Sequence, residues 1–388
     1  TGISRVESDL RIKLVPSPST WQFTLETLGN VSTRSVGRRG PAAVRTSSVN
    51  PYEASTAITI KPTDVELGNA SVDVGGRARL RGINTTYDSW PLVGSLVQNI
   101  AENEYFKQSS LANRIGRRRI QTQIGEEIDR TIGEKADLAS NQFSKTILGP
   151  LTNLNLEPRV IDMSSTSTRL IARYRMAGTW QLAAMTPRPR ALANNLFSVQ
   201  MHQSAVNNTL EQLVPQDHAL PIRKVLENCF DLLGVDPSKI PDDLPEDASI
   251  QFAKHRPITV EIEDGKVWIT MRVIRLERGN GTQLRNFIVR AAYKPESDGL
   301  NASLVRDGHL SISGPRLSMR QRFPVRAVFN KVLSPNRPLT LVTSEMLAQS
   351  VPEDTTISQF ELRDGWIGVS ISEQTGHQSV ATRPAGIR

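Results

Sequence analysis

Apolar and polar residues alternate over the first hundred positions, which is the pattern of strands with one buried face. In DLRIKLVP the residues Leu10, Ile12 and Leu14 share one face, and WQFTLETLG alternates in the same way. The segment TRSVGRRGPAAVRTSSVNP, residues 33–51, is rich in Gly, Arg and small polar residues and predicts a long basic loop. Residues 1–96 are therefore expected to form a β-rich N-terminal part.

From about Val97 the apolar period changes to about four residues, the spacing of one face of an α-helix. The stripe consists of Ile100, Leu111, Ile115, Ile124, Ile128, Ile132, Phe143 and Ile147. Glycines within this segment each cost about 1 kcal/mol relative to Ala in a helix interior, so they either break the helix or let it lie close against a sheet. Gly149 and Pro150 form a stop signal. The pattern predicts a long central helix over residues 97–150.

Residues 151–372 return to alternation and predict a β-rich C-terminal part, with two short helices near residues 204–233. The sequence ITVEIEDGKVWITM contains Asp264–Gly265, a two-residue hairpin signal. This turn pairs Ile262 with Val267, Val260 with Ile269, and Ile258 with Met271. All six side chains share one face, so the turn and the apolar pattern select the same register.

Two further Asp–Gly pairs predict hairpins by the same arithmetic. Asp364–Gly365 sets Leu362 against Ile367, and Asp307–Gly308 sets Val305 against Leu310. Residues 373–388 have neither a period nor apolar mass, and we expect them to form a disordered tail.

Composition favours a folded protein with acidic partners. Of the 388 residues, 38% are hydrophobic and 22% are charged, as in globular chains, and the net charge is +8. No run of residues is long and apolar enough for a membrane span. The single cysteine, Cys229, lies in an apolar helical pattern and is expected to be a buried small hydrophobe. The chain opens without Met, and we interpret it as a mature or truncated product with an extracytoplasmic location, periplasmic or secreted.

The sequence contains no recognisable catalytic or metal-binding motif. The histidines are isolated from one another, and no nucleophile elbow, phosphate-binding loop or dinucleotide-binding fingerprint is present. The acidic stretch PDDLPED, residues 241–247, lacks the ligand spacing and Gly of a calcium loop. We therefore predict no catalytic residues, no metal ligands, no cofactor and no enzymatic activity.

An arginine cluster opens the middle of the predicted long helix. Arg114, Arg117 and Arg118 stand at i, i+3 and i+4 and so share one helix face. Three interpretations are open: a solvated helix face, contact with an anionic membrane surface, or a nucleic-acid groove. No aromatic residues interleave, and Glu126 and Glu127 follow, which would repel a phosphate backbone. The solvated face is favoured, an anionic surface comes second, and no specific nucleic-acid binding is expected.

The order of elements from Leu196 onward resembles the tubular lipid-binding (TULIP) superfamily, which includes bactericidal permeability-increasing and lipid-transfer proteins. MHQSAVNNTLEQLV resembles that family's passage from strand to helix, in which Ser204 is followed three residues on by Asn207. LPEDASIQFAKHRPITVEIEDGKVWITM resembles its next step, an apolar strand, a Pro, and a hairpin. The resemblance implies an α+β fold with strongly twisted antiparallel β-sheets packed against one long central helix and shorter helices.

The same resemblance implies a non-catalytic protein of the cell envelope or secreted space that binds a lipid or other apolar ligand. The expected lining residues are Ile258, Val260, Ile262, Val267, Ile269, Met271, Ile124 and Ile128. The alternative is a structural or adhesive extracytoplasmic β-protein with a packed core and no ligand, and an enzyme ranks third. The two leading interpretations differ in whether protein atoms cover the apolar strand faces. The sequence makes no prediction about the oligomeric state.

Overall fold

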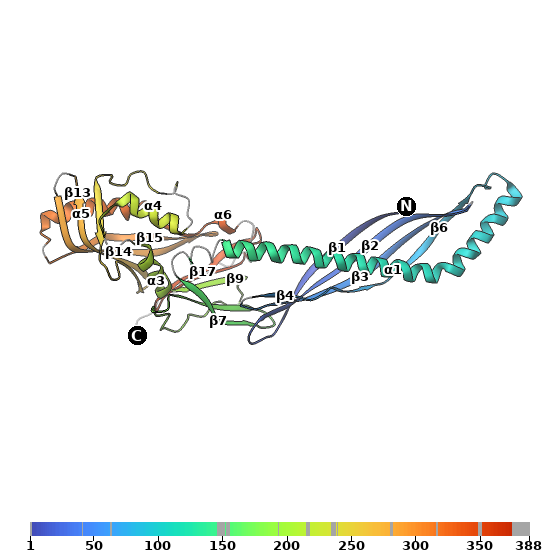
Figure 1. Cartoon of the computed structure of the whole chain (residues 1–388), viewed down its shortest axis with the longest axis horizontal. Helices are drawn as coiled ribbons and strands as arrows, with labels where there is room; N and C mark the ends of the chain where they lie inside the picture. The colour runs from blue at the N-terminus through green and yellow to red at the C-terminus, as the bar shows by residue number, and fades with distance from the viewer. Residues whose placement is uncertain are drawn as a thin grey trace. The chain divides into compact units, whose positions relative to one another are not determined.

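The protein is described here from a computed structural model that covers residues 2–40, 42–62, 64–145, 152, 156–192, 194–214, 218–233, 238, 240–279, 282–315, 317–347 and 351–374. The chain forms two compact units. Unit 1 comprises Thr1–Lys145 and Val160–Tyr174, and unit 2 comprises Thr146–Arg159 and Arg175–Arg388. Unit 1 thus combines the predicted N-terminal β-part with the predicted long helix. Many of the elements are labelled in Figure 1.

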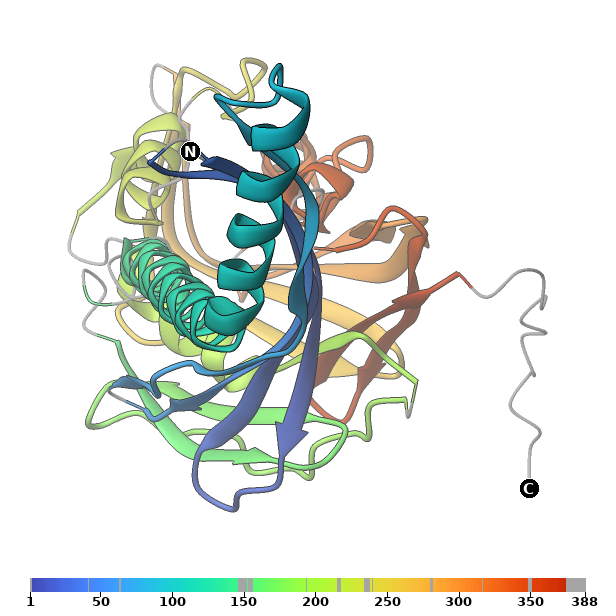
Figure 2. The same ribbon diagram turned by 90° about the vertical axis from the view of Figure 1, so that its right-hand side faces the viewer.

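The sheet of unit 1 is built on one long hairpin. Its strands, β2 (Trp21–Arg39) and β3 (Ala42–Ile60), pair in unbroken antiparallel register. On the other side of β2 lies β1 (Gly2–Val15), also antiparallel. Three shorter strands pair with β3 at successive positions: β4 (Val65–Leu67), β5 (Ser71–Val74) and β6 (Arg77–Thr85). Figure 2 shows these strands, in blue, as a twisted sheet.

The predicted basic loop at residues 33–51 was wrong, because this segment forms the end of the β2–β3 hairpin. The chain reverses at Gly40, whose φ of 55° lies in the left-handed region that glycine adopts readily. Apart from the arginines, the strand positions on both sides of the turn hold mainly Ser, Thr, Ala and Val. Such residues suit a pleated surface, although they do not give the strong apolar alternation that marks a strand in sequence.

The long helix α1 (Pro91–Phe143) is present as one element of 53 residues. It begins six residues before the predicted start, with Pro at the first helical turn, where the missing N–H costs nothing. The glycines do not break it, and a Cβ added at Gly125 would only touch Val72 at 3.7 Å. The predicted stop at Gly149–Pro150 lies outside the described residues.

Packing and hydrogen bonds join α1 to the sheet of unit 1. Ile120, Ile124 and Ile128 pack against a cluster of Val31, Tyr52, Ala54, Val72 and Val74. Three polar side chains of α1 then bond the backbone of β5, of β6 and of the residue before β5. Asn113 Oδ1 accepts from Ala78 N at 3.0 Å, Gln121 Nε2 donates to Val72 O at 2.6 Å, and Asp129 Oδ1 accepts from Ala70 N at 2.8 Å.

A returning ribbon completes unit 1. It consists of β7 (Glu157–Ser165) and β8 (Leu170–Ala177), which pair with each other, and residues 160–174 of it belong to unit 1. Ser17 and Ser165 exchange two backbone hydrogen bonds of 2.9 Å. Trp21 Nε1 donates to the Ile171 carbonyl at 2.7 Å. The ribbon is therefore tied to the chain at the β1–β2 connection.

Unit 2 has a larger sheet in the order β10–β11–β13–β14–β15–β16, with β12 paired to β13. These strands are β10 (Leu220–Pro221), β11 (Ala248–Phe252), β12 (Ile258–Glu263), β13 (Lys266–Arg278), β14 (Thr282–Asp298), β15 (Asn301–Ser313) and β16 (Leu339–Val342). A smaller sheet consists of β9 (Phe197–His202), β17 (Thr355–Arg363) and β18 (Trp366–Glu373). The helices are α3 (Gln203–Leu213), α4 (Ile222–Leu233), α5 (Met319–Val332) and α6 (Ser344–Leu347).

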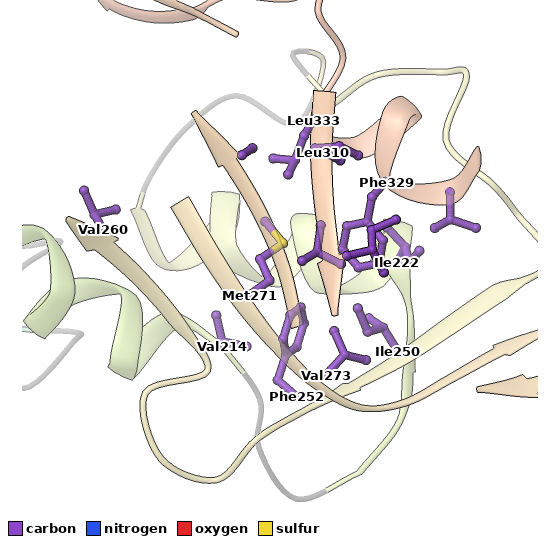
Figure 3. Packing of buried hydrophobic residues seen from close by; sticks show 14 of the residues in the cluster. Val214, Ile222, Ile250, Phe252, Val260, Met271, Val273, Leu310, Phe329 and Leu333 are labelled. Carbon is purple, nitrogen blue, oxygen red and sulfur yellow. The ribbon is translucent and has the colours of Figure 1, made fainter. Parts of the chain in front are cut away.

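The core of unit 2 lies between the larger sheet and its helices. Buried residues of α4 and α5, including Ile222, Val325 and Phe329, join those of β11 and β13–β15 in one cluster. Phe287 and Phe329 meet edge to face, with ring centroids 6.3 Å apart. Figure 3 shows Met271 and Val273 of β13 among these side chains. The α5 helix is fixed at its start by a capping box between Ser318 and Gln321.

Two of the three predicted hairpin registers are present in the sheets. The pairing of Ile258 with Met271 and its two neighbours is confirmed residue by residue, as is that of Leu362 with Ile367. The hairpin at Asp307–Gly308 was wrong, because β15 continues through it. Gly308, with φ 74°, lies instead where the β14–β15 register shifts. A bulge that needs a left-handed glycine has the same local signature as a tight turn.

The fold class is confirmed as α+β, with curled antiparallel sheets, one long helix and shorter helices. The helices predicted near residues 204–233 are α3 and α4. Of the tail predicted at 373–388, residues 375–388 lie outside the described part. Within the described ranges, no helix combines the length and apolar character needed to cross a bilayer.

Candidate functional site

The hairpin residues predicted to line a groove lie in the core of unit 2. Val260, Ile262, Val267 and Met271 are buried, and Ile258 and Ile269 pack against the same cluster. Residues of α3, α4 and α5 belong to that cluster, so protein atoms already cover this strand face. This is the arrangement that the packed-core alternative expects for these six residues.

The α3 helix also closes the free edge of β12, the outer strand of that hairpin. Asn207 Oδ1 accepts from Val260 N at 2.6 Å, and its Nδ2 donates to Val260 O at 2.9 Å. Gln203 Oε1 accepts from Ile262 N at 2.7 Å. Two amide side chains thus take the place of a neighbouring strand at this edge of β12.

An uncovered apolar surface occurs instead in unit 1. We call the sheet face that contacts α1 the inner face. Val6 on β1 stands directly opposite the buried Val31 on β2, and side chains alternate along a strand, so Leu10 and Ile12 share this face. Leu10 and Ile12 are each 64% exposed, whereas the intervening residues on the opposite face are charged. The α1 helix, through Ile124 and Ile128, packs on a cluster formed by β2, β3 and β5, and no residue of β1 belongs to that cluster.

Exposed apolar side chains also occur on α1. Of the predicted stripe, Ile124 and Ile128 in its middle are partly buried against the sheet. Ile115 is 58% exposed, and the other exposed apolar residues of this helix are Leu96, Ile100, Phe106, Leu111 and Leu138. Ile147 lies outside the described residues, and the structure does not describe the Phe143 side chain. The exposed apolar side chains of Leu10 and Ile12, side by side on one face of β1, are a candidate binding surface.

Toward the hairpin tip the inner face changes from apolar to hydroxylic. Ser4 and Thr33, on β1 and β2, bond through their hydroxyl groups at 3.0 Å. Ser35 and Thr46, on β2 and β3, do the same at 2.7 Å. The inner face therefore has an apolar region around Leu10 and a region of hydroxyl groups nearer the tip. Such a surface matches a ligand with an apolar part and a polar part.

The opposite face of the same sheet carries an arginine face near the hairpin tip. Arg34 lies opposite Ser47, which lies opposite Arg79, and Arg81 Nε donates to Ser47 Oγ at 2.7 Å. The arginine face consists of Arg34, Arg38, Arg45, Arg77, Arg79 and Arg81, all exposed. Within the described part of the chain, no carboxylate lies within ion-pair distance of any of them. This positive surface was missed in sequence because half of it falls in the segment predicted as a loop.

The predicted cluster of Arg114, Arg117 and Arg118 lies exposed on α1, and no ion pair to these three residues is found among the residues that the structure describes. Farther along the helix, Arg130 pairs with both Glu127 and Glu134. The Arg130 guanidinium lowers the pKa of Glu127 through a hydrogen bond and charge attraction. Arg130 therefore neutralises Glu127 and Glu134, and neither acid pairs with the predicted arginine cluster.

Unit 2 offers little for chemistry. In the described ranges no group of three or more His, Cys, Asp and Glu residues is placed to hold a metal ion. Burial raises the pKa of the half-buried Cys229 to about 11, so its thiol stays protonated and unreactive at neutral pH. A hollow of about 400 Å³ beside the middle of β13 and the end of β15 is lined by Arg272, Phe287 and Gly314 among others.

Comparison with known proteins gives a likeness to solved structures but none in sequence. No family model matches the chain, and no curated protein matches it by sequence. Among solved structures, the crystal structure of a lipopolysaccharide binding protein is similar, with 10% sequence identity over 97% of this chain and 88% of that one, and a TM-score of 0.29. At this TM-score the likeness supports no statement about what this chain binds.

Proposed function

We propose that the protein is a non-catalytic lipid-binding protein of the cell envelope or secreted space, and that an acyl chain lies on the inner face of unit 1. The observation that carries this proposal is the exposure of Leu10 and Ile12, together with Val6, on a sheet face that α1 covers only in part. The site differs from the hairpin of unit 2, where Val260 and Met271 already have protein neighbours.

The energetics favour an apolar occupant over water. Burying a side chain such as Leu or Ile is worth about 1.5–3 kcal/mol, and this gain is unrealised while Leu10 and Ile12 face water. An acyl chain contributes about 0.8 kcal/mol for each CH₂ group that it buries. A chain of ordinary length laid over these residues would therefore remain bound through purification.

The polarity gradient of the inner face orients the ligand. The tail would lie over Leu10 and Ile12, and a polar headgroup would lie toward the hydroxyl groups of Ser4, Thr33 and Ser35 nearer the hairpin tip. Hydroxyl groups both donate and accept hydrogen bonds, so this region suits an uncharged or phosphate-bearing headgroup.

An anionic membrane surface is the partner that the arginine face would meet. Unpaired guanidinium groups attract phosphates, and this face offers more of them than the predicted cluster of Arg114, Arg117 and Arg118. No aromatic side chain alternates with the arginines along β2, β3 or β6, which disfavours specific binding of nucleic acid.

The alternative of a structural or adhesive β-protein is favoured by the packed core of unit 2. It leaves the uncovered inner face of unit 1 without a role. We therefore rank this alternative second, and we propose no catalytic activity.

Native mass spectrometry and organic extraction of the purified protein test the proposal directly, and a fluorescent fatty acid measures uptake. We expect a co-purifying lipid or detergent, and loss of uptake in Leu10→Glu and Ile12→Glu, whose exposed side chains make these changes tolerable to the fold. Ile3→Glu is the matched control, because Ile3 lies on the same strand but on the opposite face and is 81% exposed.

Three results would contradict the proposal: a protein that extracts clean, no fatty-acid uptake, or equal loss of uptake in Ile3→Glu and Leu10→Glu. Val260→Trp is expected to destabilise unit 2 by overpacking its core, without a selective effect on uptake. Binding to vesicles of anionic phospholipid measures the contact of the arginine face with a membrane. We expect salt, and the double variant Arg34→Glu with Arg79→Glu, to weaken this binding.

A further inference from the structure

The first strand of unit 1 has a free edge. Within the described residues β1 pairs with β2 alone and ends the sheet. It is 14 residues long, and its residues are exposed from Gly2 to Lys13. A long exposed edge strand presents a row of unpaired backbone N–H and C=O groups that readily accepts another strand, and natural proteins usually block such edges. This edge carries no Pro along the strand.

The charges of β1 are only partly matched within the chain. Arg5 pairs with Glu7 at 3.2 Å, and Lys13 with Glu26 at 3.9 Å. Asp9 and Arg11, which lie between them on the outer face, have no ion pair among the residues that the structure describes. The middle of the free edge therefore holds one unpaired acid and one unpaired base, two residues apart.

We propose that β1 pairs with β1 of a second copy of this chain, antiparallel and two-fold symmetric about Leu10. In this register the numbers of the two paired residues add up to 20. Asp9 then stands opposite Arg11 of the second copy, Glu7 stands opposite Lys13, and symmetry repeats both pairs. All the directly opposed charges on the outer face are complementary, which is the arrangement that stabilises cross-strand pairs.

Neighbouring registers lack this property. A shift that makes the numbers add up to 18 places Asp9 against Asp9, and a sum of 22 places Arg11 against Arg11. A sum of 16 places Glu7 against Asp9 and Arg5 against Arg11. Like charges directly opposite each other are destabilising, so the sequence of β1 selects one register out of these.

The inner face of the sheet agrees with the same register. Leu10 meets Leu10, and Val6 meets Leu14 of the second copy. The inner faces of the two copies would then form one continuous apolar surface across the two-fold axis. The inference stands on the edge and its charges, so it does not depend on whether a lipid binds there.

Charge reversal tests the pairing by sedimentation velocity over a range of concentrations. Wild type is expected to form dimers, and Asp9→Arg or Arg11→Asp to raise the dimer dissociation constant by on the order of tenfold or more, because two attractive pairs become repulsive. The double variant Asp9→Arg with Arg11→Asp restores complementarity and should restore dimers. Glu53→Arg is the control, since it makes the same change of charge on a strand that is not at the edge.

Disulfide trapping tests the register. Leu10→Cys places two thiols directly opposite each other, within reach of a disulfide, and should yield a cross-linked species of twice 42.9 kDa under mild oxidation. Ser8→Cys should not, because Ser8 faces Ile12 of the second copy. Wild type, with only Cys229, controls for other cross-links. A monomer at all concentrations, no rescue by the double variant, or trapping through Ser8→Cys in place of Leu10→Cys would overturn the proposal.

Discussion

Removal of the Asn207 side chain should weaken unit 2 strongly, because this one amide serves both polar groups of a buried residue. In Asn207→Ala, the backbone N–H of Val260 loses its acceptor at 2.6 Å and the Val260 carbonyl loses its donor at 2.9 Å. Val260 is only 6% exposed, so water cannot readily replace either bond. The variant therefore leaves two unsatisfied groups at the edge of β12.

The size of the effect follows from the number of groups left unpaired. A buried donor or acceptor without a partner costs about 1–3 kcal/mol, so two such groups cost about 2–6 kcal/mol. Domains are stable by about 5–15 kcal/mol, which makes this a large share of the stability of unit 2. A loss of about 3 kcal/mol would lower the melting temperature by about 6–12 °C in a domain of this size.

Urea unfolding followed by tryptophan fluorescence, to which Trp180, Trp268 and Trp366 of unit 2 contribute, measures the change. We expect a lower midpoint for Asn207→Ala with the slope unchanged, and a smaller loss for Asn207→Asp, which keeps an acceptor for the Val260 N–H but cannot donate. Asn336→Ala, at an exposed position, is the control. If Asn207→Ala moves the midpoint no more than Asn336→Ala does, α3 does not hold the edge of β12 as described.

Two further predictions concern Ile124 and His202. Ile124→Asp should destabilise unit 1 by about 2–4 kcal/mol, because it places a carboxylate against the cluster around Val31. Ile115→Asp, at an exposed position of the same helix, should change the stability by less than about 0.5 kcal/mol, and equal shifts of the two variants in thermal unfolding would refute this. Burial lowers the pKa of His202 from its ordinary 6.5, so the unfolded chain takes up a proton more readily than the folded one. The contribution of neutral His202 to the stability of unit 2 is therefore fully present above about pH 6.5 and is lost as the pH falls through the lowered pKa. Between about pH 7 and about pH 5, the melting temperature of unit 2 should fall more in wild type than in His202→Gln.

The register at Asp264–Gly265 was predicted correctly because turn chemistry and apolar pattern agree there over three successive residue pairs. At Asp264–Gly265 both select the pairing of Val260 with Ile269, and a slip of one residue would move the apolar side chains of one strand to the other face. At Asp307–Gly308 the same dipeptide occurs in a continuous strand, where Gly308 provides the left-handed conformation of a bulge. The local signature is identical, and only the neighbouring strand β14 decides between turn and bulge.

The candidate site was harder to predict because exposure is a property of tertiary structure. Alternation correctly placed Leu10 and Ile12 on one face of a strand, but a strand pattern does not reveal whether another element covers that face. The arginine face could not be predicted from the sequence for a related reason. Arg34 and Arg79 are distant in sequence and become neighbours only through Ser47 on the strand between them.

The returning ribbon has a consequence for the order in which unit 1 can be completed during synthesis. The carbonyl of Ile171 that accepts the Trp21 indole N–H lies 150 residues later in the chain. At about 5–20 residues per second, a ribosome needs on the order of ten seconds to reach it, during which the first three strands and α1 are already made. Unit 1 is thus finished only after synthesis has passed into the segments of unit 2. A fragment ending at Lys145 would lack residues 160–174 altogether, and it would leave the indole of Trp21 and the backbone of Ser17 without their partners.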